Sequence, residues 1–174
     1  MSAVVFLRAV NVGTANRCRP AEIAKELSKF DVVNIGAVGT FVVRKDVSES
    51  ALRATFARQL PFKCDIMICP ARELLKLVTK DPFAKEPSGP GFTRFVNVLH
   101  KPLRKRPSLP LSLPTDDDWL AKIIAIEGTF VLGIYRREIK AIGYLGKIEK
   151  LLEVPATNRN WNTIQKVVEV LKNT

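Results

Sequence analysis

The order of short apolar runs and amphipathic stripes in the first 70 residues restricts the fold more than any other feature. Residues 3–7 are apolar and rich in β-branched side chains, a pattern typical of a buried strand. From Pro20 onward, apolar side chains recur at positions 23, 24, 27 and 30, which places them on one face of a helix. Two further strand-like runs, 32–38 and 40–43, are separated by Gly39, whose backbone freedom suits a tight hairpin.

A second amphipathic helix and a fourth strand follow. Ser48 is a favourable N-cap, the residues behind it repeat their apolar positions every four residues, and Pro61 ends the helix. Residues 63–69 are again apolar and strand-like. Residues 1–70 therefore predict the order β-α-β-β-α-β, which is that of the ferredoxin-like plait.

The second half of the chain shows a similar order of elements. A short helix begins at Pro70, and the Pro- and Gly-rich stretch that follows marks a boundary between lobes. Strands are predicted over 92–99, 122–126 and 130–135, with a hairpin at Gly128; helices are predicted near 116–120, 145–152 and 161–171.

These elements predict an α+β fold. We expect two ferredoxin-like (split βαβ, alpha-beta plait) lobes, with antiparallel or mixed sheets and helices on one face. The N-terminal lobe is expected to span residues 1–80 and the C-terminal lobe 91–174, with 81–90 as the connection.

Composition points to a soluble, basic, cytoplasmic protein. Lysine and arginine total 28 against 17 acidic residues, a net charge of +11 that attracts nucleic acid, nucleotides or other anions. No apolar stretch has the length of a signal-peptide core or a membrane span, so no membrane association is expected. The three cysteines lack zinc-site spacing and His100 is the only histidine, so neither a metal site nor a cofactor is predicted.

Two distant segments resemble one bacterial family. Residues 6–13 read Phe-Leu-Arg-Ala-Val-Asn-Val-Gly, and residues 156–163 read Ala-Thr-Asn-Arg-Asn-Trp-Asn-Thr. Both are similar to signatures of the family known as domain of unknown function 1697, and residues 61–83 also follow its pattern. The resemblance implies an α+β protein of two plait-like lobes and brings no established activity. This chain departs from the family pattern at Ala9, at Thr14 and in the hairpin at 38–40.

The terminal motif suggests a site for an anion. We expect it to lie just before and at the start of the last helix, where backbone N–H groups lack intrahelical partners and the helix dipole is positive. Arg159 would add a bidentate donor, and Asn158, Asn160 and Thr163 further hydrogen bonds. The alternative, which capping favours, is that the asparagines cap the helix, Arg159 pairs with a carboxylate and Trp161 anchors the core.

A polar loop after the first strand suggests the other half of that site. Arg8, Asn11 and Arg17 leave or follow the strand, and loops at strand ends often carry function. If the two motifs lie together, these residues and Arg159 form one cationic pocket between the lobes. Packing of one lobe on the other explains the same residues equally well.

Two charged runs have simpler interpretations. Residues 100–107 hold the densest cluster of cations and would suit a phosphate backbone, but they lack interleaved aromatics, so a solvated loop is favoured. Residues 116–118 are three aspartates, for which capping of a helix is favoured over cation binding.

Catalytic motifs are scarce. The chain has no Walker A loop, no Gly-x-Gly-x-x-Gly and no His-Glu-x-x-His sequence. The favoured hypothesis is a noncatalytic module that binds an anionic, phosphate-containing ligand or nucleic acid between its lobes. Two alternatives stay open: an enzyme acting on a small phosphorylated or carboxylated substrate, and a structural or oligomerisation domain.

Overall fold

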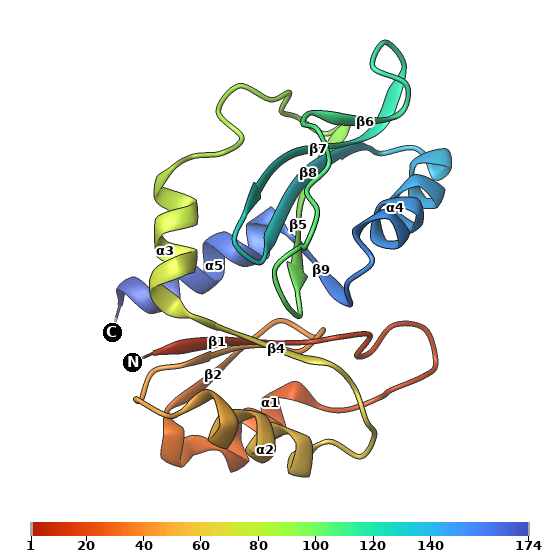
Figure 1. Ribbon diagram of the computed structural model, residues 1–174. Helices are drawn as coiled ribbons and strands as arrows, with labels where there is room; N and C mark the ends of the chain where they lie inside the picture. The colour runs from red at the N-terminus through yellow and green to blue at the C-terminus, as the bar shows by residue number, and fades with distance from the viewer. Residues whose placement is uncertain (1, 174) are drawn as a thin grey trace. The chain divides into compact units, whose positions relative to one another are not determined.

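The computed structural model describes residues 2–173, which fold as an α+β protein with two antiparallel sheets and five α-helices over that range. The α+β class predicted from the sequence is confirmed. The chain divides into two compact units, shown in Figure 1: residues 1–79 together with 162–174, and residues 80–161.

The first unit is built on a four-stranded sheet in the order β2-β3-β1-β4, in which all neighbours are antiparallel. Its strands are β1 (Ala3–Leu7), β2 (Val32–Ile35), β3 (Thr40–Val43) and β4 (Ile66–Pro70). Its helices are α1 (Pro20–Glu26), α2 (Glu49–Gln59), α3 (Ala71–Thr79) and α5 (Trp161–Lys172), whose first residue belongs to the second unit; a 3₁₀ turn, η1 (Ser28–Phe30), follows α1.

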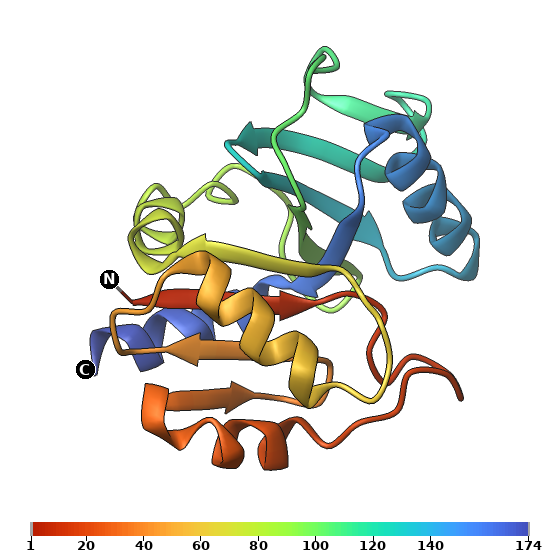
Figure 2. The ribbon, with the colours of Figure 1, turned by 60° about the horizontal axis from the view of Figure 1, so that its bottom comes forward.

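The sheet of the first unit is buried on both faces. Val5 and Leu7 of β1 join a core cluster with α1 and α2, and the intervening residues Val4 and Phe6 are also 0% exposed. Helices α3 and α5 lie on the opposite side of this sheet from α1 and α2 (Figures 1 and 2). Helices therefore cover both sides of the sheet rather than one face.

Local signals account for the boundaries of these elements. The Ser48 hydroxyl accepts a hydrogen bond from the Ala51 N–H at 3.3 Å and caps α2, as predicted. Gly39 has a φ of +80°, and a Cβ there would lie 2.8 Å from Cβ of Leu7, so the hairpin needs glycine. Strand β2 ends at Ile35 and β4 begins at Ile66, both shorter than predicted.

The second unit carries a five-stranded antiparallel sheet in the order β6-β7-β8-β5-β9. Helix α4 (Ile139–Leu152) packs on one face through Ile148 and Leu152, which share a core cluster with Phe95. The strands are β5 (Phe92–Leu99), β6 (Leu111–Pro114), β7 (Trp119–Glu127), β8 (Phe130–Arg136) and β9 (Ala156–Asn160).

One prediction for the second unit is wrong, and two of its strands were not predicted. The helix predicted near 116–120 is a turn that leads into β7, where the Asp118 N–H donates to the Thr115 hydroxyl at 3.2 Å. The proline-rich stretch contains strand β6, because an edge strand tolerates prolines at its ends. The residues just before the last helix form strand β9, since pairing with β5 satisfies their backbone groups despite their polar side chains.

The two sheets share an order once β6 is set aside. The sequence β7-β8-β5-β9 repeats β2-β3-β1-β4 with the same antiparallel pairing. The first connection differs, because α1 crosses from β1 to β2 whereas residues 100–110, between β5 and β6, contain no helix and three prolines. Proline within a helix removes a backbone hydrogen bond and clashes with the preceding turn, so this segment stays extended.

Candidate functional site

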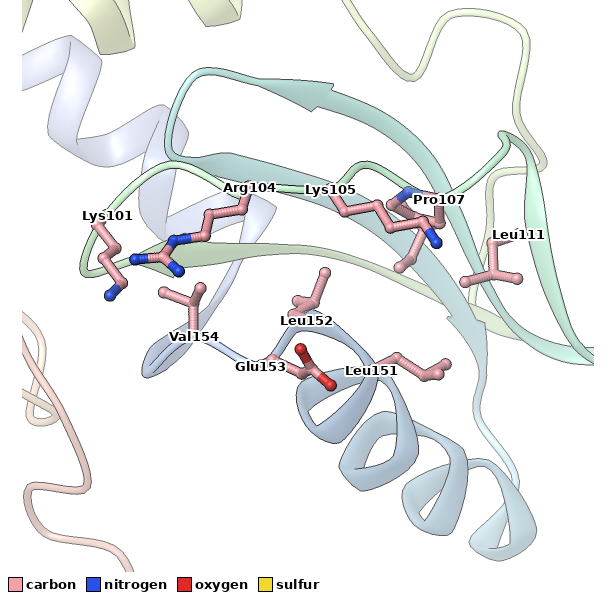
Figure 3. Close-up of a pocket in the computed structure, with 10 residues that line it drawn as sticks. Lys101, Arg104, Lys105, Pro107, Leu111, Leu151, Leu152, Glu153 and Val154 are labelled. Carbon is pink, nitrogen blue, oxygen red and sulfur yellow. The ribbon is translucent and has the colours of Figure 1, made fainter.

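A pocket of about 530 Å³ opens in the second unit beside this helix-free connection (Figure 3). One wall is the segment that follows β5, between Lys101 and Pro107. The opposite wall is the end of α4 and the residues after it, Leu151 to Val154. In topology the pocket corresponds to the place of α1 in the first unit. Helix α1 connects β1 to β2, and the pocket lies along the connection between the equivalent strands of the second unit, β5 and β7.

The pocket has an apolar floor. Ile123 of β7 is 0% exposed and Leu152 of α4 is 5% exposed, and both belong to the hydrophobic core of the second unit. Leu111 of β6 and Val154 complete this floor. At the rim, Leu151 is 59% exposed, so an apolar surface continues from the core to the solvent.

Three cations stand at one side of the opening. Lys101, Arg104 and Lys105 extend from the loop that faces Leu151 to Val154 (Figure 3). Among residues 2–173, none of the three has an ion pair or a side-chain hydrogen bond. The neighbouring Arg106 differs, since its guanidinium donates to the carbonyl of Ile126 at 3.4 Å.

The wall opposite the three cations carries less negative charge than they carry positive charge. Glu153, the one carboxylate that lines the pocket, ends α4 with a φ of +52° and lies across the opening from the cations (Figure 3). The carboxyl end of α4 adds a partial negative charge. The three full positive charges exceed this negative charge, so the lining of the pocket carries a net positive charge.

The loop residues predicted from the first motif lie in the first unit and have local roles. The amide nitrogen of Asn11 donates to the carbonyls of Cys18 and Ala37 at 3.0 and 2.7 Å, and its oxygen accepts from the Cys18 N–H at 3.0 Å. These bonds hold the loop closed and use most of the amide's capacity. Arg8 pairs with Asp65 at 3.2 Å, and Arg17 is exposed.

Strand β9 separates the residues of the terminal motif. Successive side chains of a strand point to opposite faces, so Asn158 and Asn160 lie on one face and Arg159 on the other. The Asn158 amide nitrogen donates to the side-chain oxygen of Asn97 at 2.8 Å. Thr163 lies in α5 and belongs to the first unit.

Arg159 is a buried cation, with 5% of its surface exposed. Its guanidinium donates to the Thr157 hydroxyl and to the Asn158 carbonyl, both at 2.7 Å. Burial lowers the pKa of Arg159 to about 10, which still leaves the group charged at neutral pH.

The seven residues predicted as a ligand site are thus divided between the units. Arg8, Asn11, Arg17 and Thr163 belong to the first, and Asn158, Arg159 and Asn160 to the second. Ligand binding by these residues stays a prediction. The pocket instead uses three cations of the run 100–107, a segment for which the sequence favoured a solvated loop.

The apolar part of the pocket was missed by sequence reasoning. Ile123, Leu151 and Leu152 read as ordinary core residues of a strand and a helix, and only the fold brings them beside the basic run. The available signal was the spacing of prolines in 102–114, which forbids a covering helix where the first half has one.

The cysteines are protonated thiols, and the described residues form no cluster of metal ligands. Burial raises the pKa of all three cysteines, which keeps them protonated at neutral pH. Within residues 2–173 no group of three or more His, Cys, Asp or Glu side chains is placed to hold a metal ion. Over the same residues, no helix has both the length and the apolar character needed to cross a membrane.

Comparison with known proteins supports the architecture. The chain is similar to the solved structure of a conserved bacterial protein from Streptococcus pneumoniae, at 16% identity and a TM-score of 0.61, over 98% of each chain. At this identity the likeness shows a shared fold. No curated protein matches the chain.

A family match covers most of the sequence. The family described as protein of unknown function (DUF1697) matches residues 1–118, from β1 through the basic run of the pocket to the turn before β7. The terminal motif at 156–163 lies beyond the matched residues. Because the match spans well over half of the chain, the protein belongs to the DUF1697 family.

Proposed function

We propose that this protein is a noncatalytic module that binds an anionic, phosphate-containing ligand in the pocket of its second unit. One observation carries the proposal: three cations without ion pairs in the described chain border a pocket whose floor is apolar. Cations on an open surface are hydrated and need no partner. Cations beside an apolar concavity favour an anion that displaces water from both surfaces.

The side chains suit a phosphate group. Arg104 presents a planar guanidinium that can donate two parallel hydrogen bonds to phosphate oxygens, while Lys101 and Lys105 act as point charges. The pocket volume of about 530 Å³ falls within the range of roughly 300–1,000 Å³ that is common for small-molecule sites. A small molecule therefore fits the pocket better than a folded partner does.

The absence of hydroxyl, thiol and imidazole groups from the described lining favours binding over catalysis. The described residues that line the pocket include no serine, threonine, cysteine, histidine or tyrosine. An enzyme acting here would depend on Glu153 or a lysine for proton transfer. The enzyme hypothesis would be favoured instead if the protein turned over a bound phosphate compound and the Glu153→Gln variant did not.

We further infer that both units are split-βαβ plaits. The support is the common strand order, with β-α-β-β-α-β elements in the first unit and the same order without its first helix in the second. In this interpretation β6 is an addition at the edge of the second sheet. The pocket then results from the loss of one crossover helix.

Calorimetric titration with pyrophosphate tests the proposed function. Arg104→Gln should weaken binding by about tenfold, because a charge-assisted hydrogen bond contributes about 1.5 kcal/mol or more and each 1.4 kcal/mol is tenfold in affinity. Rising salt should weaken wild-type binding as well, since exposed charges are screened.

The matched control is Arg58→Gln, which removes the same charge from an exposed site on α2 in the first unit. It should leave pyrophosphate affinity within about twofold, as expected for a distant surface charge. An equal loss of pyrophosphate affinity in both variants would show that the affinity depends on net charge and not on the pocket. Unchanged affinity in Arg104→Gln would overturn the proposal.

A further inference from the structure

We infer that the phosphate group of the ligand is attached to an aliphatic body rather than to a nucleobase. The inference rests on the proposed function and narrows it to a class of ligand. It follows from what the pocket contains beside its cations, and from how its two surfaces are arranged.

The described lining of the pocket is aliphatic throughout its apolar part. Leu111, Ile123 and the leucines of α4 form the floor and rim, and no aromatic side chain is among the lining residues. Proteins that hold nucleobases commonly stack them on aromatic rings or on arginine planes, and the one arginine of the described lining, Arg104, is assigned to the phosphate. Several aromatic residues of this unit pair with one another instead, as in Phe95 with Tyr135 and Phe92 with Trp119.

The cations and the leucines of α4 occupy different walls, and the second of these walls also carries Glu153. The three cations extend from the loop 101–107, and Leu151, Leu152 and Val154 form the facing wall (Figure 3). An amphiphilic anion matches this division, because its head can meet the cations while its body covers the leucines. A hydrophilic phosphate compound would leave the apolar wall without a partner.

Leu151 indicates where the body of the ligand would end. This side chain is 59% exposed at the rim, directly after the turn of α4 that is anchored by Ile148 at 0%. An aliphatic chain that runs from the buried floor to the rim would cover it. Each methylene buried in this way contributes up to about 0.8 kcal/mol, or about fourfold in affinity.

A homologous series of alkyl phosphates tests this inference on the intact protein. Calorimetry would compare inorganic phosphate with ethyl, butyl and hexyl phosphate, and each of these with adenosine monophosphate. We expect affinity to rise by about two- to fourfold per methylene, and hexyl phosphate to bind at least about tenfold more tightly than the nucleotide. The heat capacity of binding should become more negative along the series.

Two variants separate the contributions of head and body. Leu151→Gln should flatten the dependence at its long-chain end, between butyl and hexyl phosphate, and leave inorganic phosphate binding within about twofold, because only the apolar contact at the rim is lost. The matched control is Ile142→Gln, at a 65% exposed site on the same helix that does not line the pocket, and it should preserve the dependence. Arg104→Gln should weaken all the phosphates by a similar factor, about tenfold.

The outcomes distinguish the two proposals. If alkyl chains add no affinity, or if adenosine monophosphate binds as tightly as hexyl phosphate, the aliphatic inference is wrong while the anion site stands. If no phosphate compound responds to Arg104→Gln, the proposed function fails and the inference fails with it. Equal flattening by Leu151→Gln and Ile142→Gln would place the alkyl chain outside the pocket.

Discussion

The two units have sheets of the same strand order, apart from the added β6, and differ in the connection that follows the first strand. In the first unit α1 connects β1 to β2, which lie on either side of β3, and Ile23 of α1 and Leu27 at its end enter the hydrophobic core. In the second unit the corresponding segment is held extended by prolines; its Leu103 packs against the core, and three of its cations line the pocket beside the sheet. The first arrangement fills the core, and the second leaves a pocket with a charged rim.

Their last strands differ in a similar way. Both β4 and β9 have five residues and run directly into a helix, but β4 is apolar whereas β9 is polar and buries an arginine. In the first unit, the side chains of the last strand therefore serve mainly to form the hydrophobic core. In the second unit, the polar side chains lie on a strand, β9, whose position is fixed by its backbone pairing with β5. A rigid element of this kind can hold polar groups in a fixed arrangement.

The largest expected effect compares core residues in the two units. Leu27→Ala should lower the free energy of unfolding by about 2–5 kcal/mol, because the side chain is 1% exposed within a filled core. Leu111→Ala should cost about 1 kcal/mol, since its side chain already borders open space. Urea unfolding followed by far-UV circular dichroism measures both, and equal losses would contradict the contrast between a filled and an open core.

A smaller effect is expected from the buried arginine of β9. Arg159→Met should lower the free energy of unfolding by about 1–3 kcal/mol, because the Thr157 hydroxyl and the Asn158 carbonyl lose a buried donor. Thermal unfolding would measure this against Arg58→Met, a change at an exposed site that should cost less than about 0.5 kcal/mol.

The same variant addresses the motif hypothesis. With the anion in the pocket of the second unit, Arg159→Met should keep pyrophosphate affinity within about twofold at a temperature where it is folded. A tenfold loss would instead support the ligand role predicted for Arg159 from the sequence.

Sequence reasoning succeeded where a local pattern and its tertiary setting agree. Three such local patterns predicted what is observed: the apolar stripe of α1, the N-cap at Ser48 and the glycine hairpin at Gly39. Strand β5 was predicted with its observed bounds because aromatic and β-branched residues recur along 92–99, in spite of the polar residues among them.

It failed where pairing with a distant strand decides the structure. The polar residues of β9 carry no strand signal, and the aspartates before β7 look like a helix cap until the hairpin with β6 is known. The pocket was missed for the same reason. Its cations were visible in the sequence, but their position beside Ile123 and Leu152 depends on contacts between segments far apart in the chain.

Backbone amide chemical shifts during a pyrophosphate titration test the central claim most directly, because they locate the anion in the chain. The account predicts that the largest shifts fall in residues 101–107 and 151–154, and that they are lost in Arg104→Gln. Shifts centred on residues 8–17 and 158–163, with the pocket segments unchanged, would contradict it and return the site to the two sequence motifs.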